Sequence, residues 1–142
     1  MLLQENGRES MTNISKKVGL SIDAVNNRVK TLLKKEIFYT GIFINPYAIG
    51  YRFIVDVKIK LGNVALEERE RFIAYLKEYS RIVSLFSITG KHDFVCVIVA
   101  RDATELEETS TEIRNKFKNC IDDWETTLYL KTHKLEHYEL LK

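Results

Sequence analysis

The apolar residues near the start of the chain recur at helical spacing and predict two helices joined by a tight turn. Ile14 and Val18 lie four positions apart, and Gly19 follows them as a helix stop. Ser21 then stands where an N-cap belongs. Because the connection at residues 19–21 is short and contains glycine, we predict a helix-turn-helix. The second helix is predicted to bury a stripe formed by Ile22, Val25, Val29, Leu32 and Leu33.

After residue 50 the alternation of apolar and polar residues becomes the main signal. Phe53, Val55 and Val57 alternate with Ile54 and Asp56, which is the period of two expected of a strand. Asn63 is a plausible helix cap, and Asp102 opens a capping box with a glutamate three positions later. The predicted elements are, in order, a strand at 53–61, a helix at 63–79, strands at 82–89 and 94–100, a helix after residue 102, and a strand at about 124–131.

This order of elements predicts the fold class. A strand, helix, strand, strand, helix, strand sequence with right-handed crossovers gives a four-stranded antiparallel sheet covered by two helices. The protein is therefore predicted to be α+β, with an N-terminal helix-turn-helix domain and a C-terminal ferredoxin-like domain. Residues 37–46 are too apolar for a flexible linker and are interpreted as a connecting strand that ends at Pro46. The predicted domains are residues 1–45 and residues 46–142.

Composition excludes several classes of protein. Apolar residues make up 45% and charged residues 30% of the 142 residues, which is typical of a soluble globular protein. No apolar run approaches the ~18 residues of a membrane helix, and the first residues do not resemble a secretory signal. Two cysteines are too few for a disulfide framework, so we expect reduced thiols and a cytoplasmic protein without membrane partners.

The charge distribution adds a second signal to the helical half. Residues 1–50 carry seven Lys or Arg against four acids, a net charge of +3, whereas the remainder carries −1. A basic N-terminal third indicates a polyanionic partner. A solvated helix face would give a similar excess, so charge alone fits either interpretation.

The basic helix has the residue types of a DNA-reading helix. Short polar side chains near its N-terminus are suited to reach base edges, and cations farther along are suited to meet phosphates. Asn27 pairs well with adenine and Arg28 with guanine, so these two are predicted to read bases. The alternative is an amphipathic helix with a wet polar face. The predicted contacts with double-stranded DNA are Ser21, Asp23, Asn26, Asn27, Arg28, Lys30, Thr31 and Lys34.

The turn between the second and third predicted strands is a candidate ligand site. The carboxylate of Asp93 could accept hydrogen bonds from the ammonium group of a small molecule, and Gly90 lets a ligand approach the backbone. The alternative is a plain hairpin in which Gly90 supplies a positive φ and Asp93 bonds its own backbone.

Enzyme chemistry and metal binding have little support in the sequence. His133 and His137 could clamp a metal if helical, but no compelling third ligand accompanies them. No phosphate-binding loop, zinc signature or nucleophile at triad spacing is present. Cys96 and Cys120 are interpreted as structural. We therefore expect no enzyme activity, no metal and no cofactor.

Several segments together resemble the leucine-responsive/asparagine regulator (Lrp/AsnC) family over nearly the whole chain. The segment 14–21 with Ala24-Val25 and Arg28-Val29-Lys30 resembles the family's DNA-binding helices. Ile44-Asn45-Pro46 resembles its entry into the second domain, and Gly90-Lys91-His92-Asp93-Phe94 resembles its Gly-x-x-Asp-aromatic turn. The resemblance implies a winged helix-turn-helix transcriptional regulator that forms homodimers and higher homo-oligomers. It also implies an effector, often an amino acid, bound near Gly90, Lys91, His92 and Asp93.

Two departures from the family pattern keep other functions open. The family's first helix normally begins earlier, and a glycine usually closes its recognition helix, where this chain has Lys34-Lys35-Glu36-Ile37. One alternative is a sensor module without DNA binding that assembles with a complete relative. A second is an enzyme resembling sirohaem decarboxylases, although the paired Arg-Arg of that group is replaced here by Phe38-Tyr39.

Overall fold

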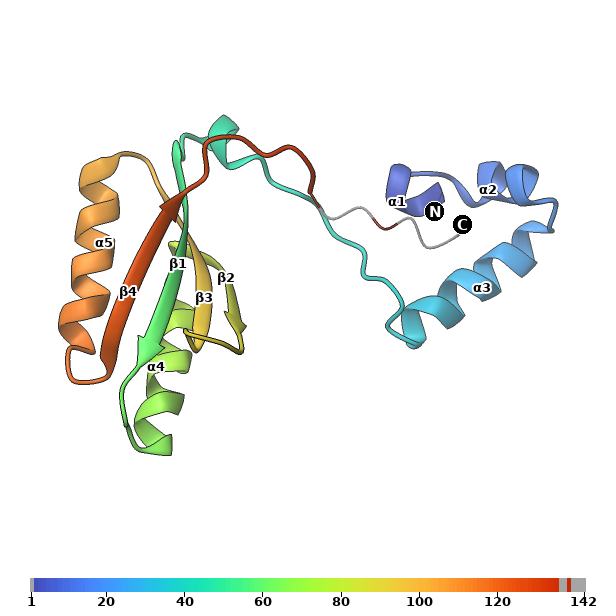
Figure 1. Ribbon diagram of the computed structural model, residues 1–142. Coiled ribbons are helices and arrows are strands. Elements are labelled where there is room, and N and C mark those ends of the chain that lie inside the picture. Colours follow the sequence, from blue (N-terminus) through green and yellow to red (C-terminus); the bar gives the residue numbers. More distant parts are fainter. Residues whose placement is uncertain (1, 136–137, 139–142) are drawn as a thin grey trace. The chain divides into compact units, whose positions relative to one another are not determined.

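The computed structural model describes residues 2–135 and residue 138. These residues fall into two compact units, one formed by residues 2–44 with the described residues beyond 132, and the other by residues 45–132 (Figure 1). The side-chain amide of Gln4 is hydrogen-bonded to the backbone of Tyr138 in both directions, at 3.1 and 3.3 Å. The limits 1–45 and 46–142 for independent domains stay a prediction.

The first unit contains the predicted helix-turn-helix. Gly19 ends the helix before the turn with a φ of 68°, a conformation that glycine adopts without steric cost. The side-chain oxygen of Ser21 accepts a hydrogen bond from the backbone N–H of Ala24, so Ser21 caps the next helix as expected. The helices are α1 (Leu2–Glu5), α2 (Met11–Val18) and α3 (Ile22–Lys34).

The prediction that α3 buries its whole apolar stripe is wrong within the described chain. Val25 is buried and 3% exposed, whereas Ile22, Leu32 and Leu33 are between 37% and 43% exposed. The physical reason is the size of the neighbouring helices. Because α1 has four residues and α2 has eight, they offer too little surface to cover a helix of 13 residues.

The end of α3 supplies the conformation that a glycine usually provides. Glu36 has a φ of 54°, and among the described residues it is the only non-glycine residue with a positive φ. The backbone N–H groups of Glu36 and Ile37 donate to the carbonyl oxygens of Leu33 and Leu32, each at 3.0 Å. This pair of bonds satisfies the last carbonyls of the helix and turns the chain away.

The second unit is the predicted ferredoxin-like domain. Its four antiparallel strands lie in the order β2-β3-β1-β4, so the first strand is central (Figure 1). The elements are η1 (Pro46–Ile49), β1 (Phe53–Leu61), α4 (Leu66–Glu78), β2 (Ile82–Ser87), β3 (Phe94–Ala100), α5 (Ala103–Lys116) and β4 (Ile121–Leu128).

The core lies between the sheet and its two helices. Alternate residues of β1, from Val55 to Leu61, are buried in a cluster with side chains of both helices. Phe72 on α4 lies at its centre, 5.0 Å from the ring of Phe117 in an edge-to-face arrangement and 5.9 Å from the ring of Phe94. The two helices cover only this face of the sheet. The alternate side chains of each strand point to the opposite face.

Four local predictions need correction. The connecting strand predicted at 37–46 is not formed, because a strand needs a hydrogen-bonding partner and no described segment pairs with these residues. The second strand ends at Ser87 rather than 89, because the N–H of Ile88 bonds to Asp93 and closes the loop. The last strand spans Ile121–Leu128. Helix α4 begins after Ala65, not Asn63, and has no side-chain cap.

Among the described residues, no helix is both long enough and apolar enough to cross a membrane.

Candidate nucleic-acid and effector sites

The polar face of α3 presents most of the predicted DNA contacts together. Seven of the eight predicted residues are exposed, and Asn26 is half-buried. Asn27, Arg28 and Thr31, together with Leu32, line a shallow hollow of about 290 Å³. The hydroxyl of Thr31 donates to the carbonyl oxygen of Asn27 at 2.8 Å, and Ser21 is engaged as the helix cap. Asn27 and Arg28, the two residues predicted to read bases, are both exposed.

The cations of this face are available for an external anion. Within residues 2–135, none of Arg28, Lys30 and Lys34 takes part in an ion pair. Lys17 on α2 differs, because its ammonium nitrogen lies 2.7 Å from a carboxylate oxygen of Glu9. A cation without an internal partner has no ion pair to break when it meets a phosphate.

Asp93 locks the loop between β2 and β3 onto the central strand. One carboxylate oxygen accepts the backbone N–H of Leu61 at 2.8 Å, and the other lies 3.2 Å from the ammonium nitrogen of Lys60. The backbone N–H of Asp93 donates to the carbonyl of Ile59 at 2.9 Å. The hydrogen bond from Leu61, supported by Lys60, holds the pKa of Asp93 below its usual range. The carboxylate of Asp93 thus bonds the backbone of β1 rather than the backbone of its own turn.

We expect the Asp93 contacts to make the fold sensitive to acid. Because the pKa of this carboxyl is lowered in the folded state, its stabilisation is present above the unfolded value near pH 4 and is lost as the pH falls. Asp93→Asn is expected to remove about 1 kcal/mol of stability at pH 6 and less at pH 3. Urea unfolding at both pH values measures this difference.

The matched control for this measurement is Asp122→Asn. The Asp122 side chain is exposed and, among the described residues, its carboxylate takes part in no ion pair. An equal loss of stability at pH 6 and pH 3 for Asp93→Asn would contradict the assigned role of the carboxylate.

The remaining residues of the turn contact the edge strand β4. The ammonium nitrogen of Lys91 lies 3.2 Å from Asp123, on a side chain that is 74% exposed. The turn itself is open at Gly90, whose φ of 127° disfavours any other residue. His92 is buried, and its Nε2 atom lies 3.3 Å from Asp123 and 3.8 Å from Glu125. Gly90 and Lys91 are therefore the turn residues that a ligand can reach.

Sequence reasoning missed the partners of this turn. Lys60 and Asp123 are opposite residues on β1 and β4, as are Lys58 and Glu125, whose charged groups lie 3.3 Å apart. Opposite charges at paired positions of two strands are a usable signal once the strand register is known. The sequence predicted both strands but not their register.

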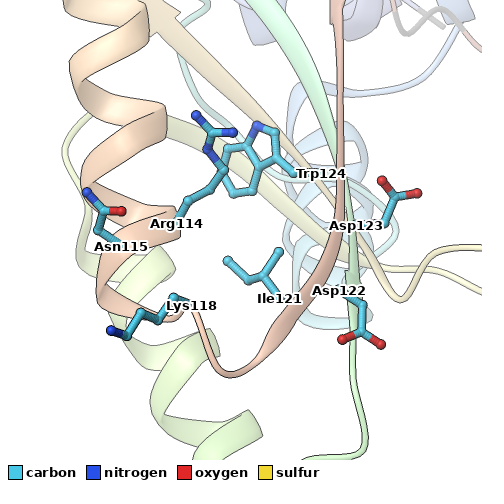
Figure 2. Close-up of a pocket in the computed structure, with 7 residues that line it drawn as sticks. All are labelled: Arg114, Asn115, Lys118, Ile121, Asp122, Asp123 and Trp124. Atoms are coloured by element: carbon cyan, nitrogen blue, oxygen red, sulfur yellow. The ribbon is translucent and has the colours of Figure 1, made fainter.

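A second hollow lies between the end of α5 and the start of β4. Its volume is about 520 Å³, and its lining residues are Arg114, Asn115, Lys118, Ile121, Asp122, Asp123 and Trp124 (Figure 2). Figure 2 shows the carboxylates of Asp122 and Asp123 on the opposite side of the β4 ribbon from Arg114, Asn115 and Lys118. Because these charged groups do not converge, the hollow by itself does not define a ligand site.

Metal and thiol chemistry have no site in the described part of the chain. No group of three or more His, Cys, Asp or Glu residues is suitably placed there to bind a metal ion. His137 lies outside the described residues, so its spacing from His133 is not tested. Cys96 and Cys120 are buried free thiols, and burial raises the pKa of Cys96 to about 12. A thiol with so high a pKa is a poor nucleophile.

Comparison with known families matches both units. A family model described as the Lrp/AsnC ligand binding domain covers residues 53–138, and a model described as winged helix-turn-helix DNA-binding covers residues 2–38. The chain is 32% identical over 135 residues to the HTH-type transcriptional regulator Ptr1 of Methanocaldococcus jannaschii, covering 94% of this chain and 88% of that protein. It is 29% identical over 143 residues to the HTH-type transcriptional regulator FL11 of Pyrococcus abyssi, with 94% and 85% coverage.

Solved structures with the same fold are also regulators. A transcriptional regulator from Neisseria meningitidis, crystallised as a complex with L-Met, matches with a TM-score of 0.85 and 22% identity over 99% of this chain and 90% of that chain. A feast or famine regulatory protein from M. tuberculosis, complexed with L-methionine, matches with a TM-score of 0.85 and 23% identity, with 99% and 92% coverage. At these identities the match shows a shared fold.

Proposed function

The chain belongs to the Lrp/AsnC family, and from this premise we propose that it is a sequence-specific DNA-binding transcriptional regulator. The observation that carries the proposal is the polar face of α3, on which Arg28, Lys30 and Lys34 are exposed and form no ion pair with any described residue. The relatives named above are transcriptional regulators and not enzymes, so the decarboxylase alternative is not favoured. A regulator of this kind acts on DNA, and we place it in the cytoplasm without a membrane partner.

We propose that the sheet face opposite the helices binds a second copy of the chain. Ile54 on β1 and Val95 and Val97 on β3 point to that face, and Phe86 on β2 adds a side chain that is 57% exposed. Partly exposed apolar side chains grouped on one sheet face favour a protein interface. A homodimer would present two α3 helices to half-sites about 34 Å apart along the DNA, and dimers would assemble into higher oligomers.

We propose that a small effector, an amino acid, binds at the turn formed by Gly90, Lys91, His92 and Asp93. Support comes from the open backbone at Gly90, the exposed Lys91 ammonium group and the L-methionine bound to two proteins of the same fold. An effector changes DNA binding only if the effector binds one oligomeric assembly of the chain more tightly than another. In this proposal Asp93 holds the turn in place, since one carboxylate oxygen accepts the N–H of Leu61 and the other lies near the ammonium group of Lys60.

The test of the proposed function is retention of DNA by the purified full chain. DNA from the chain's own upstream region competes against unrelated DNA at two salt concentrations. We expect specific retention that weakens steeply as salt rises, because phosphate contacts release counterions. Equal binding to both DNAs would contradict sequence-specific recognition. Absence of binding to either DNA would favour the alternative of a sensor module that assembles with a complete relative.

The effector assignment makes a separate prediction. Each standard amino acid, beginning with L-methionine, is added to the DNA-binding assay with the wild-type chain and with Asp93→Ala. Loss of the turn's attachment to Leu61 is expected to abolish the response and to leave DNA binding without effector intact. Lys118→Ala, in the hollow beside α5, is the control and is expected to respond as the wild type does. An unchanged response in Asp93→Ala would remove this turn from the effector site.

A further inference from the structure

The sheet face opposite the helices carries a regular grid of side chains. Residues two apart on one strand point to the same face, and the strand register fixes which residues lie beside them. Two adjacent rows cross the four strands in the order β2, β3, β1, β4. The first row is Ser84, Val97, Asp56 and Thr127, and the second row is Phe86, Val95, Lys58 and Glu125.

The grid has an apolar half and a charged half. On β2 and β3 the two rows contain two valines, a phenylalanine and a serine, whereas on β1 and β4 they contain three charged residues and a threonine. The charged groups of Lys58 and Glu125 lie 3.3 Å apart, on side chains that are 39% and 46% exposed. Asp56 is half-buried and forms no ion pair with a described residue. A partner of this face therefore meets apolar groups on one side and charges of both signs on the other.

A second copy of the chain can lie on this face in two ways. Two sheets that pack face to face in the aligned manner keep their strand directions within about 30° of each other. Because the two copies of a homodimer are related by a twofold axis, that axis runs nearly along the strands or nearly across them. Each direction brings a different set of residues together.

An axis along the strands, through the middle of the sheet, gives a poor match. It places β3 of one copy over β1 of the other and β2 over β4. Val95 then faces Lys58, and Phe86 faces Glu125. Charged groups would lose water against apolar side chains without gaining a partner, which costs free energy.

An axis across the strands, running between the two rows, matches the apolar halves. Each strand then faces the same strand of the other copy in the opposite direction, so the first row lies over the second. Val95 of one copy faces Val97 of the other, and Phe86 faces Ser84. The small serine leaves room for the phenylalanine ring, and the apolar halves of both copies lose water together.

The same axis matches the charged halves. Asp56 of one copy faces Lys58 of the other, and Glu125 faces Thr127, whose hydroxyl is able to donate to a carboxylate. Each of these contacts occurs twice in the dimer because the interface is symmetric. In this arrangement every charge of the two rows meets an opposite charge or a hydrogen-bonding group.

We propose that the open sheet face selects a second copy of this same chain, in the antiparallel orientation, through reciprocal contacts between Asp56 and Lys58. The inference rests on the homodimer proposed above and adds the residues that decide the partner. Charges across an interface contribute more to the choice of partner than to affinity. The apolar half of the grid supplies the affinity, and a relative with like charges at these two positions is rejected.

The first test measures dimerisation of the full chain by sedimentation equilibrium at low salt. Asp56→Lys places two positive charges face to face at both contacts, and Lys58→Asp places two negative charges there. Each single variant is therefore expected to dimerise about 10- to 100-fold more weakly than the wild type. The double variant Asp56→Lys with Lys58→Asp exchanges the charges and is expected to regain dimerisation. Circular dichroism checks that each variant is folded.

Mixing the two single variants gives a second, independent test. One variant carries lysine at both positions and the other carries aspartate at both, so the mixed dimer has opposite charges at both contacts. With a mass tag on one variant, native mass spectrometry is expected to find mixed dimers in excess over both homodimers. The matched control mixes Lys77→Glu with Glu78→Lys, two exposed positions of α4 on the other side of the sheet, and is expected to give mixed dimers in random proportion.

The outcomes separate this inference from the proposed homodimer. A monomeric wild type would overturn both. A dimeric wild type whose single variants dimerise equally well would overturn the selection by Asp56 and Lys58 and leave the homodimer standing. A double variant no better than the single variants, or mixed dimers in only random proportion, would do the same.

Discussion

Arg28→Ala is expected to weaken binding to the specific DNA site about 10- to 100-fold, while binding to unrelated DNA changes far less. A bidentate contact between an arginine and guanine contributes roughly 1–3 kcal/mol of discrimination. Arg28 is exposed on the face of α3 that also presents Asn27 and Thr31, and within the described residues no internal ion pair holds it back. Fluorescence anisotropy with matched specific and mutated sites measures the change and locates the base that Arg28 reads.

Lys34→Ala is the matched variant for this measurement. Lys34 is the last residue of α3, away from the helix N-terminus that reaches base edges, so its expected partner is a phosphate. Its loss is expected to weaken specific and unrelated DNA alike and to flatten the salt dependence by about one counterion. If Arg28→Ala gave that same uniform pattern, Arg28 would be a phosphate contact and not a base-reading residue.

Phe72→Ala is expected to destabilise the second unit by about 3–5 kcal/mol, the range found when a buried aromatic residue is truncated in a core. The side chain is fully buried, and its ring meets Phe117 edge to face and Phe94 at a tilt. Its removal leaves a cavity where α4, α5 and β3 meet. Chemical denaturation of the full chain, followed by circular dichroism, measures the loss.

Leu66→Ala on the same helix is the control for Phe72. Leu66 begins α4 and is 64% exposed, so alanine removes little buried surface and slightly favours the helix. A change below about 0.5 kcal/mol is expected at such a surface position. Comparable losses for Leu66→Ala and Phe72→Ala would mean that the core is not organised around the three phenylalanines.

The fold was largely predictable because both halves carry strong periodic signals. The alternation from Phe53 to Leu61 reports a strand buried on one face, and β1 has that burial pattern. The caps Ser21 and Asp102 were identified because each side chain bonds a backbone N–H three residues later, a local interaction that the sequence contains. Local chemistry and periodicity therefore account for element type and order.

The failures are at positions where a partner from elsewhere decides the outcome. The stripe of α3 has a helical period, but burial depends on what covers it, and Ile22 and Leu33 stay partly exposed. Residues 37–45 have the composition of a strand but pair with no strand in the part of the chain that the structure describes. Composition describes what a segment prefers, and only tertiary contacts determine whether the preference is met.

The candidate sites show the same difference between local and long-range contacts. The exposed face of α3 follows from helical geometry, so its residues could be chosen from spacing alone. The turn at Gly90 was recognised. The attachment of Asp93 to Leu61 joins residues 32 positions apart, and His92 lies near Asp123, a residue on β4. Those contacts require the register of β1 against β4, which a single sequence does not reveal.

The central place of β1 also sets an order in which the chain can acquire structure during its synthesis. Both neighbours of β1, β3 and β4, follow it in the sequence, and β4 is the last strand to leave the ribosome. The sheet must close long loops before it gains its pairings, whereas α2 and α3 contact each other across a turn of three residues. The helix-turn-helix can therefore form while the sheet is still incomplete, and the strand that carries Asp123 and Glu125 is the last to join.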